Sequence, residues 1–542
     1  MIKNFQCQVF RQSRIKHQTF ILLAIVIIAA SLRFYKISSN PPGLYWDEAA
    51  FGYDAYSVLK TGHDHHGAFM PLFFESFGDW KLPGYFYLLV PSIKLFGLNE
   101  FAIRFPSALL GTLTIPVVFL LVKRLTRNPN LSLSVSLFLA ISPWHIQFSR
   151  AGFESIPALF FAVLALLFFL CAMDRKNSLF FAISFILFTL TMYTYHSYRI
   201  FTPLFIAAIF VIYAEKLKRM ISRLIFPILV AGILFIPLFL FTLKPQGSAR
   251  AASQSAFSNR SFEDARLEYD QKSKKPLRFL SKYIYQKPLY YTYVAFRGYL
   301  DHLSPGFLFF SGDQIGRHSQ VDMGQIETFE IILIVSSLFA IKLVPAQTSK
   351  IILVWLLISP IPASIVLPTP HAQRALQMSL PLAFFSGLGL WYIFRRSGLL
   401  AVKIVITFMI FYSFTTYTHL LFVHYPRKFA ADWQDGYKQM VNELVKYQNN
   451  FDKIYITNIN RLPYIYVLLY QKYDPQKFMT EGGTENHFSK YTFVASDADL
   501  RDKGRLLYVA PSWQKVDGKL LTAVNDTYGR QLYTLWEVNE KH

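Results

Sequence analysis

Residues 156–173 read IPALFFAVLALLFFLCAM, a stretch of eighteen residues without a charged side chain. A helix of about 20 apolar residues is long enough to cross the hydrocarbon core of a bilayer. Similar runs occur at 20–30 (FILLAIVIIAA) and 224–241 (LIFPILVAGILFIPLFLF). Of all 542 residues, 53% are hydrophobic and only 16% are charged, against about 25% charged in a typical soluble domain. The sequence therefore predicts a polytopic α-helical membrane protein.

The formal net charge of +22 comes largely from basic residues in short loops between apolar runs. Such loops usually face the cytoplasm, and they also attract anionic lipid. They are the N-terminal arm, KRLTRNPN (123–130), MDRKNS (173–178), EKLKRMISR (215–223), KLVPAQTSK (342–350) and RRSG (395–398). No RNA- or DNA-binding signature accompanies the charge. We therefore expect membrane lipid, and no nucleic acid, as a partner.

Eleven apolar runs alternate with these basic loops. They are residues 19–35, 104–122, 131–145, 155–172, 179–195, 200–214, 224–243, 326–341, 351–367, 375–394 and 399–422. The alternation requires the N-terminus inside and the C-terminus outside. One further apolar segment, GYFYLLVPSIKLFG (84–97), would invert every later loop if it crossed the bilayer. We therefore expect about eleven transmembrane helices, with residues 84–97 an interfacial or re-entrant helix in an external loop.

The composition divides the chain near residue 424. Residues 1–423 form the predicted membrane domain, whose two large external loops cover 36–103 and 244–325. Beyond it, residues 431–450 have helical periodicity, and 451–459, 491–497 and 504–511 read as strands beside turn-forming residues. Residues 424–542 are therefore predicted to form a small extracytoplasmic α/β or α+β domain.

Two adjacent carboxylates, Asp47 and Glu48, follow the first span within YWDEAAFGYD (45–54). Either could act as a general base toward an acceptor hydroxyl, although acidic residues also favour the first turn of a helix. Later in the same loop, Lys81 offers a positive charge for a phosphate. The alternative for this lysine is that its side chain snorkels to the membrane interface.

Two further pairs of charged residues lie at predicted outer ends of spans. Arg150 and Glu154 are four residues apart, which suits either a functional site or a helical ion pair. His371 and Arg374 lie in the proline-flanked loop PTPHAQR (368–374) and could hold a phosphate leaving group. A plain connecting loop is the alternative for that segment.

The motif HDHHG (63–67) places His63, His65 and His66 close together in the sequence. No second set of ligands has a recognisable spacing, so we assign no metal site, and no cofactor is required, although a divalent metal would be compatible. The two cysteines, Cys7 and Cys171, exclude a disulfide framework. Nucleotide-binding, serine-hydrolase and zinc-protease motifs are not found in a suitable context.

Several segments together resemble the GT-C glycosyltransferases, and within them the ArnT / protein O-mannosyltransferase / RgtA–D-like group of family 39. They are the external DE pair, a D-x-K-x-P-x-Y-x-Y pattern from Asp79, FGLNEFAIRFPSALLGTLTIPVVFLLVKRL (96–125), SPWHIQFSRAGFES (142–155), YLDHLSPGFLFFSGDQIGRHS (299–319) and PHAQRALQMSLPLAFFSGLG (370–389). The resemblance covers most of residues 20–425. It implies a GT-C fold and an active site on the outer face of the membrane.

The resemblance also assigns roles to particular residues. Asp47 would be the catalytic base or a carboxylate that orients the acceptor, with Glu48 beside it and Glu154 as the acidic residue of the second loop. The donor phosphate would be bound by Lys81, His371 and Arg374. Further candidates for lining the substrate site are Asp79, Arg150, Tyr195, His196, Asp313 and Arg317.

The expected function is transfer of a hexose or pentose from a polyprenyl-phosphate sugar to a hydroxyl of a glycan, lipid or protein. A single in-line displacement would invert the anomeric centre. The enzyme would lie in the plasma (inner) membrane, with its site and C-terminal domain extracytoplasmic. An O-antigen polymerase or ligase is the alternative enzyme, but its active site should depend on arginines. It should also lack the DE pair that follows the first span. A transporter would place ionisable residues near the middle of its spans.

Reporter fusions test the predicted topology. A reporter fused after residue 127 or 219 should give a cytoplasmic signal, and one fused after residue 430 an external signal, because of the loop charges. A cytoplasmic signal after residue 430 would contradict the alternation of basic loops from which the topology is predicted.

Overall fold

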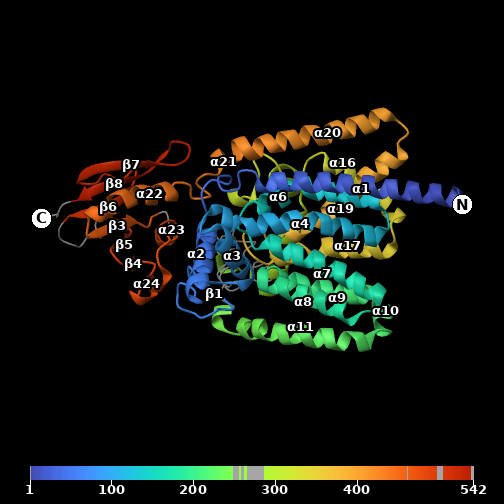
Figure 1. Ribbon diagram of the computed structural model, residues 1–542, viewed down its shortest axis with the longest axis horizontal. Helices are drawn as coiled ribbons and strands as arrows, with labels where there is room; N and C mark the ends of the chain where they lie inside the picture. Colours follow the sequence, from blue (N-terminus) through green and yellow to red (C-terminus); the bar gives the residue numbers. More distant parts are fainter. Residues whose placement is uncertain are drawn as a thin grey trace, which may run out of the picture. The chain divides into compact units, whose positions relative to one another are not determined.

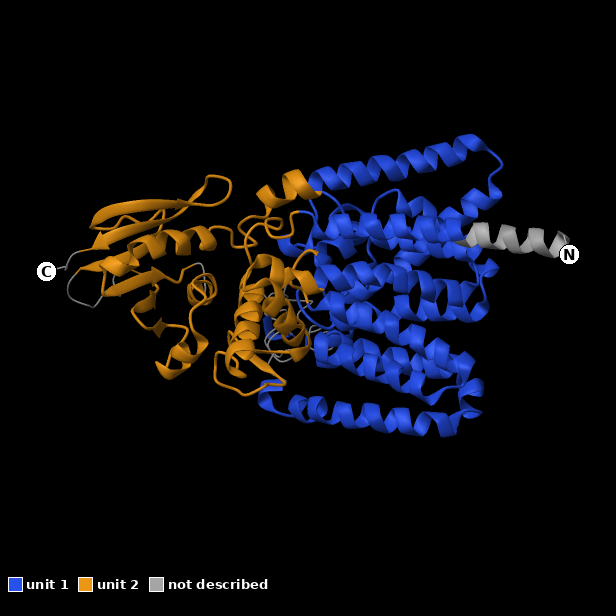
Figure 2. Cartoon of the chain, in the orientation of Figure 1, with its two compact units in different colours: residues 1–35, 107–149, 154–420 blue, residues 36–106, 150–153, 421–542 orange. Residues whose placement is uncertain are grey.

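The computed structural model describes residues 2–247, 255–257, 262–264, 286–459, 462–496 and 505–538, with side chains from residue 16 onward. Much of the predicted external loop 244–325 lies outside the described residues. The chain forms two compact units (Figure 2). The first comprises residues 1–35, 107–149 and 154–420, and the second comprises residues 36–106, 150–153 and 421–542.

Long apolar helices make up the first unit, and they run side by side (Figure 1). They are α1 (Ile2–Phe34), α4 (Glu100–Thr126, which begins in the second unit), α5 (Pro129–Ile141), α6 (Pro143–Ser149), α7 (Ser155–Arg175), α8 (Ser178–Thr194), α9 (Tyr198–Ile212), α11 (Ile221–Thr242), α16 (Glu330–Ala340), α17 (Ala346–Ile358), α19 (Ser379–Arg396) and α20 (Leu400–His419). Shorter helices are α10 (Ala214–Lys218), α15 (Lys287–Leu303) and α18 (Ile361–Ser364).

Each of the eleven predicted apolar runs coincides with a helix or with two consecutive helices. Among the described residues, seven helices are long and apolar enough to cross a membrane, or eight with the bent pair α5–α6. The shorter apolar helices α8 and α9, and α16 of 11 residues, account for the rest. The predicted fold class, a multi-pass helical membrane protein, is confirmed. The number of helices that span the bilayer remains a prediction.

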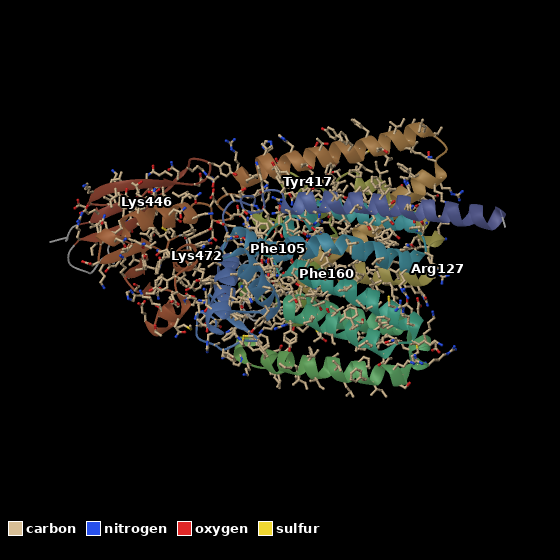
Figure 3. All side chains as sticks on the ribbon, viewed as in Figure 1. Phe105, Arg127, Phe160, Tyr417, Lys446 and Lys472 are labelled. Atoms are coloured by element: carbon tan, nitrogen blue, oxygen red, sulfur yellow. The ribbon has the colours of Figure 1, made fainter. Side chains whose placement is uncertain are left out.

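Local sequence explains where these helices begin. The Asn128 side chain accepts hydrogen bonds from the backbone N–H groups of Asn130 and Leu131, both at 3.1 Å, and so caps α5 just after Arg127 (Figure 3). Asn177 caps α8 in the same way. These caps satisfy backbone donors that a helix start leaves without partners. Both caps lie in the basic loops predicted to face the cytoplasm.

Close helix contacts hold the first unit together. A Cβ atom on Gly389 of α19 would lie 1.8 Å from the carbonyl oxygen of Leu333 on α16, so only glycine fits there. Small residues of this kind allow helices in membranes to approach closely. By contrast, α11 and α20 expose apolar side chains such as Ile233 and Phe408. Those surfaces suit contact with lipid.

A six-stranded mixed sheet forms the C-terminal part of the second unit (Figure 1). Its strands are β3 (Lys453–Thr457), β4 (His487–Phe488), β5 (Tyr491–Val494), β6 (Leu506–Pro511), β7 (Lys519–Asn525) and β8 (Gln531–Val538), in the order β4-β5-β3-β6-β8-β7. The central strands β5, β3 and β6 are parallel. Its helices are α21 (Tyr425–Lys428), α22 (Tyr437–Tyr447), α23 (Pro463–Tyr470) and α24 (Pro475–Thr480). The expected C-terminal domain with helices and strands is therefore present.

The loop 36–103, predicted to be external, packs with this sheet domain. It contains α2 (Trp46–Thr61), the hairpin β1 (Phe74–Ser76) and β2 (Asp79–Lys81), and α3 (Pro83–Phe96). One hydrophobic core joins residues of α2 and α3, such as Phe51 and Phe86, to residues of the sheet domain, such as Ile454 and Leu507. The second unit thus reaches across the predicted boundary at 423/424, because the loop and the C-terminal segment share a core.

The segment 84–97 corresponds to α3. This helix has 14 residues and contains Pro91, and it is not among the described helices that are long and apolar enough to cross a membrane. Its buried residues Tyr85, Leu89 and Ile93 belong to the shared core. That this segment adds no transmembrane span stays a prediction.

Candidate catalytic and phosphate-binding sites

Helix α2 begins with the DE pair, and the two carboxylates have different surroundings. Glu48 accepts a hydrogen bond from the backbone N–H of Tyr45 at 3.3 Å and so helps to cap the helix. The same carboxylate accepts a bond from the N–H of Gly152 at 2.7 Å. The side chain of Glu48 is fully buried, whereas that of Asp47 is 22% exposed. Helix capping therefore accounts for Glu48 and leaves Asp47 open to solvent.

A buried ion pair fixes Glu48. Arg104 of α4 donates from Nε and Nη2 to the two carboxylate oxygens of Glu48, at 2.9 and 3.1 Å. Both side chains are fully buried. A guanidinium is not deprotonated in proteins, so the pair is ionic.

The same arginine holds the chain that precedes α2. It donates to the carbonyl oxygens of Ile37 at 2.9 Å and Pro41 at 2.7 Å, and also to that of Gly43. The sequence analysis gave Arg104 no role. A signal was present, since an arginine in the otherwise apolar run 101–122 needs a polar partner when it is buried.

Lys81 lies between two carboxylates in the second unit. Its Nζ is 3.2 Å from Oδ1 of Asp47 and 3.2 Å from Oδ2 of Asp79. The lysine side chain is only 8% exposed, because β2 pairs it with the buried Phe74 of β1. Burial and pairing with acids do not fit a snorkelling lysine. The structure thus brings together three of the predicted site residues.

Residues of the sheet domain hold the start of α2. Gln434 accepts a hydrogen bond from the backbone N–H of Trp46 at 2.8 Å and another from the hydroxyl of Tyr466 at 2.5 Å. The carbonyl oxygen of Leu44 lies 2.9 Å from the same hydroxyl and shares its single proton with Gln434. Next to Gln434, the ring of Trp433 lies 5.6 Å from the Arg104 guanidinium. The sequence analysis missed these contacts, which join segments almost 400 residues apart.

The second predicted pair is not helical. Residues 150–154 lie between α6 and α7, so Arg150 and Glu154 do not form a helical i,i+4 pair. Arg150 belongs to the second unit, where it donates to the carbonyl oxygen of Asn40 at 2.7 Å. Glu154 belongs to the first unit and accepts from the Gln373 amide at 3.3 Å.

Three other predicted residues gather in loops of the first unit. Asp313 and His371 are buried there, with Arg374 one turn beyond. The Asp313 carboxylate accepts from the backbone N–H of Ala372 at 2.6 Å and lies 3.4 Å from Nδ1 of His318. Asp313 therefore ties the segment that contains it to the loop 368–375.

Electrostatics in this cluster favour an ionised aspartate and a neutral histidine. Burial would raise the pKa of Asp313, but hydrogen bonds from His318 and from backbone N–H groups bring it below its usual value. Burial lowers the pKa of His318, and the positive charges of Arg317 and Arg374 lower it further.

The first unit also contains the predicted site residues Arg374, Arg317, Tyr195 and His196. Arg374 donates from Nη1 to the carbonyl oxygen of Leu367 at 3.3 Å. The carbonyl of Arg317 accepts from the Gln147 amide at 3.0 Å. Tyr195 and His196 follow the end of α8, where the Tyr195 ring is buried.

The histidine motif 63–67 forms local contacts. His65 is buried, and its Nδ1 lies 2.5 Å from Oδ1 of Asp54. The ring nitrogen Nδ1 of His63 lies 2.9 Å from the carbonyl oxygen of Thr61. Within the described residues, the group of three side chains that could hold a metal ion is Asp313, His318 and His371. His63, His65 and His66 are not part of that group.

Comparison with solved structures identifies the fold. ArnT from Cupriavidus metallidurans in the apo state has a TM-score of 0.55 and 12% identity, over 97% of this chain and 98% of that chain. The same protein bound to undecaprenyl phosphate gives 0.55 and 11%, over 96% and 98%. The oligosaccharyltransferase AglB from Archaeoglobus fulgidus, in complex with an inhibitory peptide and a dolichol-phosphate, gives 0.50 and 15%, over 84% and 64%. The chain therefore has the GT-C fold.

A protein family and a curated relative each match part of the sequence. Residues 23–244 match the family described as dolichyl-phosphate-mannose-protein mannosyltransferase. An uncharacterized protein of Aquifex aeolicus (strain VF5) is 28% identical over 172 residues, which are 32% of this chain. The match spans about a third of the length of that relative (34%). The predicted resemblance to GT-C enzymes of the ArnT and protein mannosyltransferase group is confirmed.

We expect loss of the Arg104 charge to destabilise the second unit. Arg104→Met leaves Glu48 buried without its cation, which typically costs about 3–5 kcal/mol. Thermal unfolding of the purified protein in detergent should show a clearly lower midpoint. The double variant Glu48→Gln/Arg104→Met should recover part of the loss.

Lys446→Met is the matched control. Lys446 on α22 pairs with Glu443, but its side chain is 63% exposed (Figure 3), and such pairs contribute about 0–1 kcal/mol. If Arg104→Met and Lys446→Met lowered the midpoint equally, the ion pair would not have the importance assigned to it.

Proposed function

We propose that this protein is a membrane glycosyltransferase that moves a sugar from a polyprenyl-phosphate donor to an acceptor hydroxyl. The observation that carries the proposal is the partly exposed Asp47 carboxylate at the start of α2, which pairs with the nearly buried Lys81. The next residue, Glu48, is held by its buried ion pair with Arg104. The family match over residues 23–244 supports it. So does the fold shared with an ArnT that binds undecaprenyl phosphate and an AglB that binds dolichol-phosphate.

Membrane physics explains why such a site belongs at the membrane boundary. The long isoprenoid tail of the donor stays in lipid, while its phosphosugar must reach polar groups. We place the site on the extracytoplasmic face of the plasma (inner) membrane, because the basic loops assign that side to residues 36–103 and 368–374. The acceptor is a hydroxyl of a glycan, a lipid or a protein.

In the proposed reaction, Asp47 accepts the proton of the acceptor hydroxyl as its oxygen attacks the anomeric carbon. The bond from that carbon to the phosphate oxygen breaks, and the lipid phosphate leaves with the bonding electrons. A single displacement inverts the anomeric centre. Lys81 holds the Asp47 carboxylate in position, and its ammonium group adds a positive charge to the site. Arg374 and His371 stabilise the negative charge that develops on the phosphate.

The geometry favours unequal roles for the two carboxylates. Glu48 has both oxygens engaged by Arg104, Tyr45 and Gly152, and its side chain has no exposed surface. It therefore positions the start of α2 and does not take a proton from substrate. Asp47, with 22% of its side chain exposed, is the carboxylate that an acceptor can reach.

Asp47→Asn tests the base. The amide keeps the size of the side chain but loses its basicity, so turnover should fall by about 10²–10⁴. The assay is sugar transfer by purified protein reconstituted with a polyprenyl-phosphate sugar. Asp174→Asn is the control, because Asp174 pairs with Arg124 and is 70% exposed in a predicted cytoplasmic loop. Near-normal turnover by Asp47→Asn would refute its role as a base.

Arg374→Ala tests the phosphate contact. Loss of one charge-assisted interaction with the leaving group should cost about 2–3 kcal/mol in transition-state stabilisation, which lowers kcat/KM roughly 30- to 150-fold. Arg395→Ala, at the other end of α19, is the control. Wild-type kcat/KM in Arg374→Ala would remove Arg374 from the site.

A further inference from the structure

Three metal-binding side chains meet in the loops of the first unit. Asp313 and His318 come from the segment between the short helical turn 306–310 and α16, and His371 comes from the loop before α19. One ligand atom from each lies within 4.8 Å of the others. All three side chains are buried, with 5%, 5% and 6% exposure. We propose that Asp313, His318 and His371 bind one divalent transition-metal ion of the Zn²⁺ type.

The kind and number of donors select this class of ion. Two imidazole nitrogens and one carboxylate oxygen form a common three-residue set for zinc, with a fourth position left for water or another ligand. Magnesium and calcium prefer oxygen donors throughout. In a tetrahedral zinc site with bonds of about 2.1 Å, neighbouring donor atoms are roughly 3.4 Å apart. Oδ2 of Asp313 and Nδ1 of His318 are already separated by 3.4 Å.

The third donor lies beside this pair. The rings of His318 and His371 have centroids 4.8 Å apart. A donor nitrogen of His371 lies within 4.8 Å of the donor atoms of Asp313 and His318.

Surrounding groups orient these donors, as the outer partners of metal ligands commonly do. The Asp313 carboxylate accepts from the N–H groups of Ala372 at 2.6 Å and Ile315 at 2.9 Å. Nε2 of His302 accepts from the backbone N–H of His371 at 2.9 Å. The other ring nitrogen of His302 then carries its proton and donates to the carbonyl oxygen of Gly298 at 2.6 Å. His302 thus fixes the backbone of His371 without competing for the ion.

The ion would tie the segment 311–319 to the loop 368–375. Arg374 follows His371 by three residues, and its backbone N–H lies 3.4 Å from the His371 ring. A bound metal ion therefore fixes the part of the chain that carries Arg374. This site goes beyond the proposed function and does not depend on it, since it needs neither donor nor acceptor.

Metal content tests the proposal directly. The full chain is purified in detergent with an affinity tag that contains no histidine, incubated with ZnCl₂ and passed through a desalting column. Elemental analysis should find about one zinc per chain in the wild type and a loss of most of it in His318→Ala and His371→Ala. His63→Ala, from the half-buried histidine motif, should retain the wild-type amount. Wild-type protein without zinc, or equal zinc in all four proteins, would overturn the proposal.

Cobalt provides a readout that does not depend on variants folding. Co²⁺ loaded into the wild-type chain should give visible absorption bands of a tetrahedral site with nitrogen and oxygen ligands, and added Zn²⁺ should remove them. The absence of such bands at saturating Co²⁺ would overturn the proposal. Neither measurement involves sugar transfer, so failure of the proposed enzyme activity would leave both results unchanged.

Discussion

The buried ion pair between Glu48 and Arg104 is the interaction on which the candidate catalytic site depends. Two charges removed from water cost several kcal/mol each unless their remaining hydrogen-bonding groups find partners. Here the partners are carbonyl oxygens of Ile37 and Pro41 for the arginine, and the N–H of Gly152 for the glutamate. The pair therefore joins the chain after the first span, the start of α2 and the turn before α7.

Adjacent residues in the DE pair divide two tasks that one carboxylate could not perform. A carboxylate that anchors a helix must have its oxygens engaged, whereas a base must keep one available. Consecutive helical residues point about 100° apart, so Glu48 faces the buried arginine while Asp47 faces Lys81 and solvent. The sheet domain supports this arrangement through Gln434, which binds the first N–H of α2.

Local patterns in the sequence predicted the elements well, and contacts between distant segments poorly. Apolar runs such as 156–173 predicted helices because a bilayer imposes length and composition on a span. Loop charges predict that 84–97 lies outside the spans, and this stays a prediction. The pairing of Lys81 with Asp47 lay within reach, since both residues belong to one loop. Arg104 was missed because it was read as part of an apolar run, and His318 was missed because no ligand spacing links it to His371. The boundary at 424 followed a real change in composition, but composition does not reveal which earlier segment completes a core.

That shared core also governs when the protein can fold. Helix α3 ends at Phe96, whereas the first strand of the sheet that covers the apolar residues of α2 and α3 begins at Lys453. Roughly three hundred residues separate the two halves, and at about 5–20 residues per second a ribosome needs tens of seconds to bridge them. During synthesis, residues such as Phe51 and Phe86 therefore lack their final neighbours until the sheet has been made. The shared core can be completed only once β8 has been synthesised.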